Sequence, residues 1–160
     1  MTFDRTSLEA EGFTGWLTFP EARASGVIPL TGGVYVVCYS GRAPVAFLPS
    51  NPGGRFKGKD PSVPADALAA NWHDAEVVYI GKADQLRRRI RQFADFGAGK
   101  PIGHWGGRLI WQLAEPDQLR IAWKETPDRV PVEVEAEMIA MFRREYGKPP
   151  FANNPHLLGR

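Results

Sequence analysis

The segment Gly33-Val34-Tyr35-Val36-Val37-Cys38-Tyr39 decides the fold, because it is mostly β-branched and aromatic and follows a glycine-rich turn. Such a run predicts a β-strand whose alternate residues Tyr35, Val37 and Tyr39 share one face. A similar run at residues 76–81 ends in a glycine and predicts a second strand. Strands of this kind bury their apolar faces against helices.

The remaining elements are predicted from hydrophobic periodicity and helix-breaking residues. Residues 118–123 alternate in hydrophobicity and predict a third strand, and residues 44–48 are a weaker candidate for another. Helices are predicted to start near Pro20 and to cover residues 65–72, 84–93, 109–113 and 130–146. Together these patterns predict an α+β sandwich in which a small, three-stranded, mainly antiparallel sheet is flanked by helices.

The chain has 160 residues, which fits one domain with one core. Residues 1–30 are predicted to be an N-terminal extension packed on a domain formed by residues 31–160. Residues 49–64 contain four prolines and three glycines and predict a long insertion without regular structure. Its basic residues are expected either to grip a ligand or to lie in a mobile, solvated loop.

Charge is distributed unevenly, although the formal net charge is only +2. Residues 82–108 carry seven basic residues against two acids, and residues 115–137 carry seven acids against three basic residues. A polyanion would therefore be attracted to one part of the surface, although a basic run is more often a solvated helix face.

Composition excludes several classes of protein and site. Apolar runs are far shorter than the ~20 residues that cross a bilayer, and the N-terminus lacks the layout of a secretion signal, so we expect a cytoplasmic protein with no membrane partner. Cys38 is the only cysteine and the three histidines lack metal-ligand spacing. Any metal should therefore be held by carboxylate.

Two charged residues interrupt apolar helix faces. On a helical wheel Arg89 lies about 60° from Leu86 and borders the packed face, whereas the neighbouring arginines at 87, 88 and 91 point away. Glu135 lies inside an apolar stripe on the last helix, whose members are within about 60° of it, and Glu133 and Glu137 lie about 160° away. Burying a charge is costly, so Glu135 is expected either to pair with Arg89 or Arg108 or to serve a functional site.

The triplets Gly33-Val34-Tyr35 and Tyr79-Ile80-Gly81 resemble the two signature triplets of the GIY-YIG nuclease family. Arg89 lies eight residues after Gly81, a later helix carries the inward Glu135, and Phe151-Ala152-Asn153 resembles the closing aromatic-asparagine element of that family. The resemblance covers residues 33–153 and implies a GIY-YIG-like fold. It departs from the family in the long segment between the triplets and in Phe93, where some members have histidine or tyrosine.

The resemblance implies a metal-dependent endonuclease that hydrolyses phosphodiester bonds in DNA. Tyr35 would orient or deprotonate water with Tyr79 beside it, Arg89 would bind phosphate, and Asn153 would anchor the site. Glu135 would hold one Mg²⁺ or Mn²⁺. Further substrate contacts are expected from Lys82, Arg108, Arg55 and Lys57, and from His104, which could accept a proton, contact substrate or belong to a structural turn.

Two alternatives remain open on the sequence alone. A GIY-YIG scaffold without turnover could bind nucleic acid or a nucleotide-like ligand, because fold does not determine function. The chain could also act as a homodimer or as part of a larger repair or restriction system. The sequence does not distinguish DNA sequences, DNA structures or RNA as the substrate.

Overall fold

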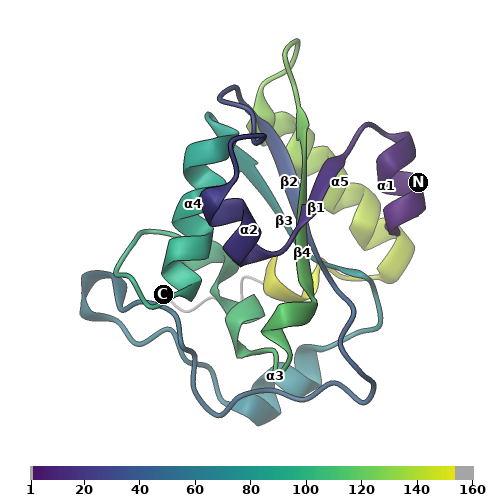
Figure 1. The fold of residues 1–160 in the computed structure, drawn as a ribbon. Helices are drawn as coiled ribbons and strands as arrows, with labels where there is room; N and C mark the ends of the chain where they lie inside the picture. Colours follow the sequence, from purple (N-terminus) through teal and green to yellow (C-terminus); the bar gives the residue numbers. More distant parts are fainter. Residues whose placement is uncertain (1, 154–160) are drawn as a thin grey trace.

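The computed structural model describes residues 2–153, and its centre is a four-stranded antiparallel sheet (Figure 1). The strands lie in the order β1-β4-β2-β3, and every neighbouring pair is antiparallel. Their bounds are β1 (Thr14–Leu17), β2 (Gly33–Tyr39), β3 (Val77–Ala83) and β4 (Leu119–Glu125). The α+β class is confirmed, but the prediction of three strands is wrong, because the N-terminal extension contributes β1 to the sheet.

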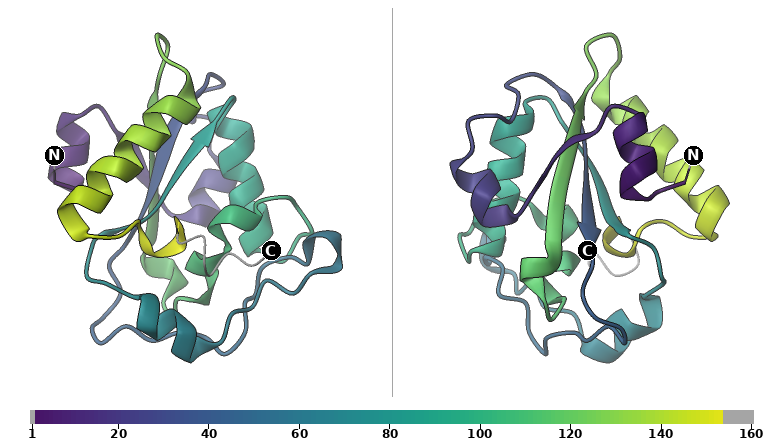
Figure 2. Two further views of the ribbon diagram at one scale, coloured as in Figure 1. Left: turned by 180° about the vertical axis from the view of Figure 1, so that it is seen from behind. Right: turned by 45° about the vertical axis from the view of Figure 1, so that its right-hand side comes forward.

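Helices cover both faces of the sheet (Figure 2). The α-helices are α1 (Arg5–Ala10), α2 (Phe19–Ala24), α3 (Ala65–Asn71), α4 (Leu86–Gly97) and α5 (Pro131–Tyr146). The 3-10 helices are η1 (Phe56–Gly58), η2 (Trp105–Gln112), η3 (Pro116–Gln118) and η4 (Phe151–Asn153). Within residues 2–153 no helix combines the length and the apolar character that a bilayer crossing requires.

Alternation along β2 divides the core into two apolar layers. Tyr35, Val37 and Tyr39 pack with α2, α4 and η2, which confirms that these three residues share a face. Val34 and Val36 pack on the other side with α1 and α5. Because β2 is a central strand covered on both sides, its apolar residues are buried on both faces.

Two predicted elements take a different form. Residues 44–48 form no strand, and only Phe47 makes an isolated bridge, to Leu113. Prolines at 44 and 49 bracket this segment and cannot donate to a strand ladder. The helix predicted at residues 109–113 belongs to the longer 3-10 helix η2, which also occupies part of the predicted loop. The glycine pair at 106 and 107 weakens α-helical preference there.

The insertion at residues 49–64 is mostly irregular, as predicted, and hydrogen bonds fix it to the domain. The Asn51 side chain donates to the Arg108 carbonyl over 2.7 Å. The Gly54 amide donates to the Phe96 carbonyl over 2.9 Å, and the Val63 amide donates to the Gln112 side chain over 2.8 Å. The insertion is thus held against the end of α4 and against η2.

Candidate active site

Two of the residues singled out in the sequence lie on neighbouring strands, Tyr35 on β2 and Tyr79 on β3, and β3 is an edge strand of the sheet. Viewed from behind, β3 lies between α5 and α4 (Figure 2, left). The two triplets are adjacent because β2 and β3 pair with Tyr35 opposite Gly81. Strand pairing therefore places residues that are distant in sequence at one site.

Gly81 leaves the space that the Tyr35 ring occupies. A Cβ atom on Gly81 would clash with the ring and would lie 2.6 Å from the Tyr35 hydroxyl oxygen. Because both groups are fixed by the strand pairing, a larger residue at position 81 would displace the phenol. The second triplet thus requires glycine in order to accommodate the tyrosine of the first.

The Tyr35 hydroxyl forms a 2.7 Å hydrogen bond with Nε2 of His104. His104 is fully buried and its ring stacks on Phe93, with 3.7 Å between the centroids and an interplanar angle of 2°. The imidazole belongs to the residue directly before η2 and lies against Phe93 of α4. The sequence signal for this contact is the flanking glycine Gly107, where a Cβ would lie 3.1 Å from the His104 ring.

Burial keeps the groups of this cluster neutral. The pKa of Tyr35 is raised well above its usual value by burial and by Tyr79, with Arg89 opposing the shift. Burial, reinforced by Glu135, raises the pKa of Tyr79 to about 12. Burial and the positive charge of Arg89 lower the pKa of His104 well below its usual value. At neutral pH the Tyr35–His104 pair is therefore a phenol beside a neutral imidazole.

The depressed pKa of His104 predicts a loss of stability in acid. In the unfolded chain His104 becomes protonated as the pH falls below its unperturbed pKa of about 6.5. In the folded chain the lowered pKa keeps His104 neutral to a lower pH. The contribution of neutral His104 to the free energy of unfolding is therefore fully present above pH ~6.5. It declines as the pH falls toward the lower pKa of the folded chain, by at most about 1.4 kcal/mol per pH unit. Urea unfolding of the wild type and of His104→Gln at several pH values from 5 to 7.5 measures this.

The difference in unfolding free energy between the two proteins should shrink as the pH falls, because only the wild type carries the titrating imidazole. Other titrating groups cancel in this difference. A difference that stays constant over the whole range would contradict the proposed burial of neutral His104.

Arg89 is half-buried and held beside the cluster. Its Nη1 donates to the Gly103 carbonyl over 2.7 Å and to the Gln92 side chain over 3.1 Å. Arg88 is exposed, as predicted. Arg87 and Arg91 are half-buried, because both donate to backbone carbonyls of residues 25–28.

Glu135 is half-buried on α5, and burial raises the pKa of its carboxyl while Lys82 opposes the shift. Among residues 2–153 this carboxylate forms no ion pair, so the expected pairing with Arg89 or Arg108 is not found. In contrast, Glu137 pairs with Arg129 over 2.7 Å on the exposed side of the helix. Glu135 is therefore a partly desolvated carboxylate without a neutralising partner in this part of the chain.

A magnesium ion fits this carboxylate better than zinc does. The described residues contain no cluster of three or more histidine, cysteine, aspartate or glutamate side chains that could hold a metal. Mg²⁺ commonly uses one or two carboxylates and keeps several waters, whereas structural zinc needs four protein ligands. Glu135 alone thus suits a hydrated Mg²⁺ or Mn²⁺, whose charge would compensate the buried carboxylate.

Asn153 anchors the outer edge of β3. Its side-chain amide accepts a hydrogen bond from the Ile80 amide and donates one to the Ile80 carbonyl, both at 2.9 Å. The Asn153 side chain thus makes the two hydrogen bonds that a neighbouring strand would make with the backbone of Ile80.

The residues expected to contact substrate lie in two different environments. Lys82, Arg55 and Lys57 are exposed, with Lys82 directly after Gly81. His104 is fully buried and Arg108 is only 3% exposed, with its guanidinium 4.5 Å from the Trp105 ring centroid. Burial lowers the pKa of Arg108 to about 10. Direct substrate contact therefore suits the first three residues better than the last two.

Comparison with known proteins gives no family model, curated protein or solved structure that matches the chain. Function therefore has to be inferred from the residues themselves and from their arrangement.

Proposed function

We propose that the chain is a GIY-YIG-type endonuclease that hydrolyses phosphodiester bonds in DNA with one bound Mg²⁺ or Mn²⁺. The observation that carries the proposal is the convergence of Tyr35, Tyr79, Arg89 and Glu135, which come from β2, β3, α4 and α5. The other three residues each contribute to the shifted pKa of Tyr35, and the ring centroids of Tyr35 and Tyr79 lie 6.1 Å apart. A phenol, a guanidinium and an unpaired carboxylate supply the groups that phosphodiester hydrolysis requires.

Arg89 would bind a non-bridging oxygen of the scissile phosphate. A guanidinium has five N–H donors in a planar fork, so the bonds to Gly103 and Gln92 leave further donors for a phosphate. These two bonds also restrict the side chain before substrate arrives, which reduces the entropy lost on binding. Lys82 would add phosphate affinity at the adjacent end of β3.

Water would be activated through the Tyr35–His104 pair. The relay requires the His104 tautomer whose Nε2 is unprotonated. As the water oxygen bonds to phosphorus and the bond from phosphorus to the leaving oxygen breaks, the water proton passes to the Tyr35 oxygen and the original hydroxyl proton of Tyr35 passes to Nε2 of His104. This relay avoids a buried phenolate, which the raised pKa of Tyr35 disfavours. Burial and Arg89 disfavour the imidazolium that forms, and the negative charge of an incoming phosphate offsets this cost.

When bound at Glu135, the metal ion supplies positive charge that stabilises the oxygen leaving phosphorus. Glu135 would hold the ion through its carboxylate, and Arg89 would neutralise the phosphate. Asn153 holds the edge of β3 through its two hydrogen bonds to Ile80.

Cleavage of supercoiled plasmid in Mg²⁺ or Mn²⁺ tests the proposal, with Tyr35→Phe as the decisive variant. Loss of the hydroxyl should slow cleavage by about 10²-fold or more, because it removes the acid-base step and leaves the ring in place. Tyr39→Phe is the matched control, since Tyr39 lies on the same face of β2 but packs against Trp72. Unchanged cleavage by Tyr35→Phe would refute the mechanism, and DNA binding without cleavage by the wild type would favour a scaffold without turnover.

A further inference from the structure

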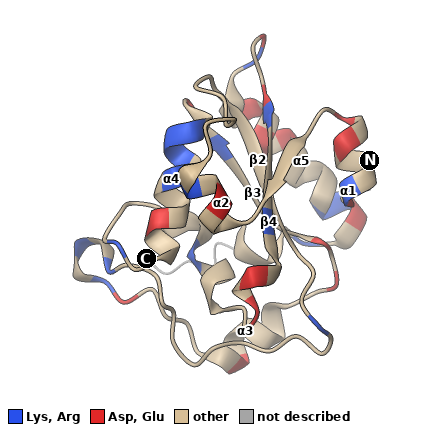
Figure 3. Cartoon of the chain, in the orientation of Figure 1, with Lys and Arg blue, Asp and Glu red and all other residues tan. Residues whose placement is uncertain are grey.

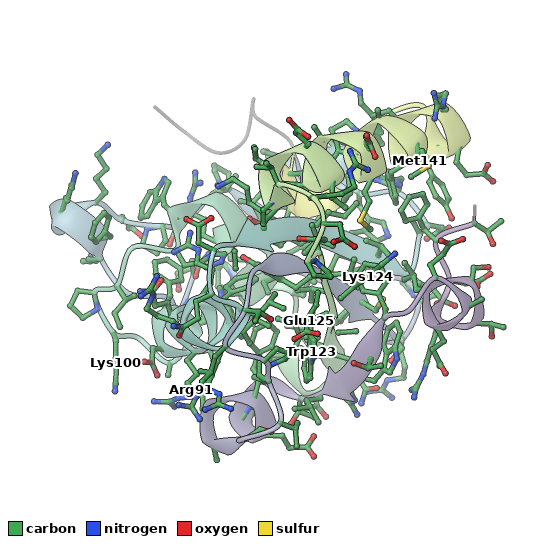
Figure 4. The ribbon with its side chains drawn as sticks, turned by 90° about the horizontal axis from the view of Figure 1, so that it is seen from above. Arg91, Lys100, Trp123, Lys124, Glu125 and Met141 are labelled. Carbon is green, nitrogen blue, oxygen red and sulfur yellow. The ribbon has the colours of Figure 1, made fainter. Side chains whose placement is uncertain are left out.

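The insertion carries a compact positive surface formed by residues 51–60, which we call the basic wing. Arg55, Lys57 and Lys59 are exposed there, and Asp60 is the only acid in this segment, 3.4 Å from Arg55. Figure 3 shows basic residues in blue on this loop. Lys100 lies at the same end of the molecule (Figure 4), and a Cβ on Gly54 would clash with the Lys100 carbonyl. Residues 51–60 and Lys100 together carry four cations against one acid, a surface suited to a chain of phosphates.

An aromatic ring lies among these cations. Phe56 is half-buried, and the Lys57 ammonium lies 5.4 Å from its ring centroid. The ring edge contacts the loop before η2, because a Cβ on Gly103 would lie 3.2 Å from Phe56 Cζ. The carbonyl of the same glycine accepts the 2.7 Å bond from Arg89. The wing is thus separated from the candidate phosphate-binding arginine by one residue.

We propose that the basic wing binds an unpaired DNA strand by stacking a base on Phe56 while its cations hold the phosphates. Cations alone suffice to bind a duplex, whose bases are already stacked on one another, whereas an accessible aromatic ring among cations serves a base that is free to stack. This inference rests on the proposed nuclease function and specifies its substrate as DNA with a single-stranded segment near the cleaved bond.

Fluorescence anisotropy with the full chain carrying Glu135→Gln tests the inference without cleavage of the probe. The probes are a thymine oligonucleotide, an abasic strand of equal length and a blunt duplex. The thymine strand should bind more tightly than the abasic strand. Phe56→Leu should weaken binding of the thymine strand by about five-fold or more, and should leave the abasic strand unaffected, because stacking contributes ~1–3 kcal/mol per base.

Three further variants separate stacking from charge and from folding. Phe56→Tyr should retain the affinity, and Phe47→Leu is the matched control, because Phe47 is also half-buried but packs beside Trp72. Lys57→Ala should reduce the salt dependence of binding by about 0.7 in the logarithmic slope, whereas Phe56→Leu should not.

Equal binding of the thymine and abasic strands, or an equal loss on all three probes in Phe56→Leu, would overturn the stacking proposal even if metal-dependent cleavage is observed. Conversely, cleavage by Glu135→Gln at the wild-type rate would refute the proposed nuclease site without changing the binding result. The two proposals therefore fail through different measurements.

Discussion

Replacement of Glu135 by alanine is expected to lower metal-dependent DNA cleavage by about 10²–10³-fold or more, because it removes the carboxylate proposed to hold the metal ion and with it the positive charge that would stabilise the leaving oxygen. Glu133→Ala is the matched control, since Glu133 is exposed on the same helix. It should retain cleavage within about two-fold, as surface substitutions usually do. Initial rates of plasmid nicking over a range of Mg²⁺ concentrations provide the measurement.

Stability measurements distinguish a metal ligand from a structural carboxylate. Burial raises the pKa of Glu135 and no ion pair within residues 2–153 compensates its charge, so the native state at neutral pH holds a charge that it disfavours. Without metal, Glu135→Ala should therefore unfold at the same urea concentration as the wild type or at a higher one. A marked loss of stability together with the loss of cleavage would instead indicate a structural role.

Replacement of Arg89 by alanine is expected to reduce cleavage by about 10²–10³-fold, the usual cost of losing a preorganised donor to a developing charge. Arg88→Ala should retain most activity, because Arg88 is exposed on the same turn of α4. The contrast is informative because both residues are arginines in one helix and differ in the direction of the side chain. Single-turnover rates with saturating enzyme measure the chemical step directly.

Arg89→Lys separates charge from geometry. Lysine keeps the positive charge and can donate to the Gly103 carbonyl, so the fold should be preserved, but it lacks the planar fork that matches a phosphate. Cleavage should therefore stay well below that of the wild type while the urea midpoint is unchanged. Full activity in the lysine variant, or a larger loss in Arg88→Ala than in Arg89→Ala, would contradict the proposed role.

Helix phase and strand alternation were sufficient to predict several features of the site. The 3.6-residue period separates Arg89 from Arg88 and Glu135 from its neighbouring glutamates, and the two-residue period places Tyr35 in the layer covered by α4. These are local properties of one element each. They can be inferred because a charged side chain on an apolar helix face is unusual, whereas an aromatic side chain on a buried strand face is expected.

Contacts between distant segments could not be predicted in this way. His104 lies 69 residues from Tyr35 in the chain and reaches it from a glycine-rich loop without periodicity. Strand β1 has only four residues and contains a bulge at Trp16, whose φ is 57°. Neither a short bulged strand nor an irregular loop has a pattern that identifies its partner, since tertiary packing determines both.

The Asn153 amide also has a consequence for how the chain avoids unwanted association. An edge strand usually exposes backbone groups that can recruit a strand from another molecule. At the centre of β3, both hydrogen-bonding groups of Ile80 are already occupied by one side chain. The strand that borders the candidate catalytic groups can therefore remain uncovered by further sheet and open to a long ligand, yet it offers a poor template for aggregation.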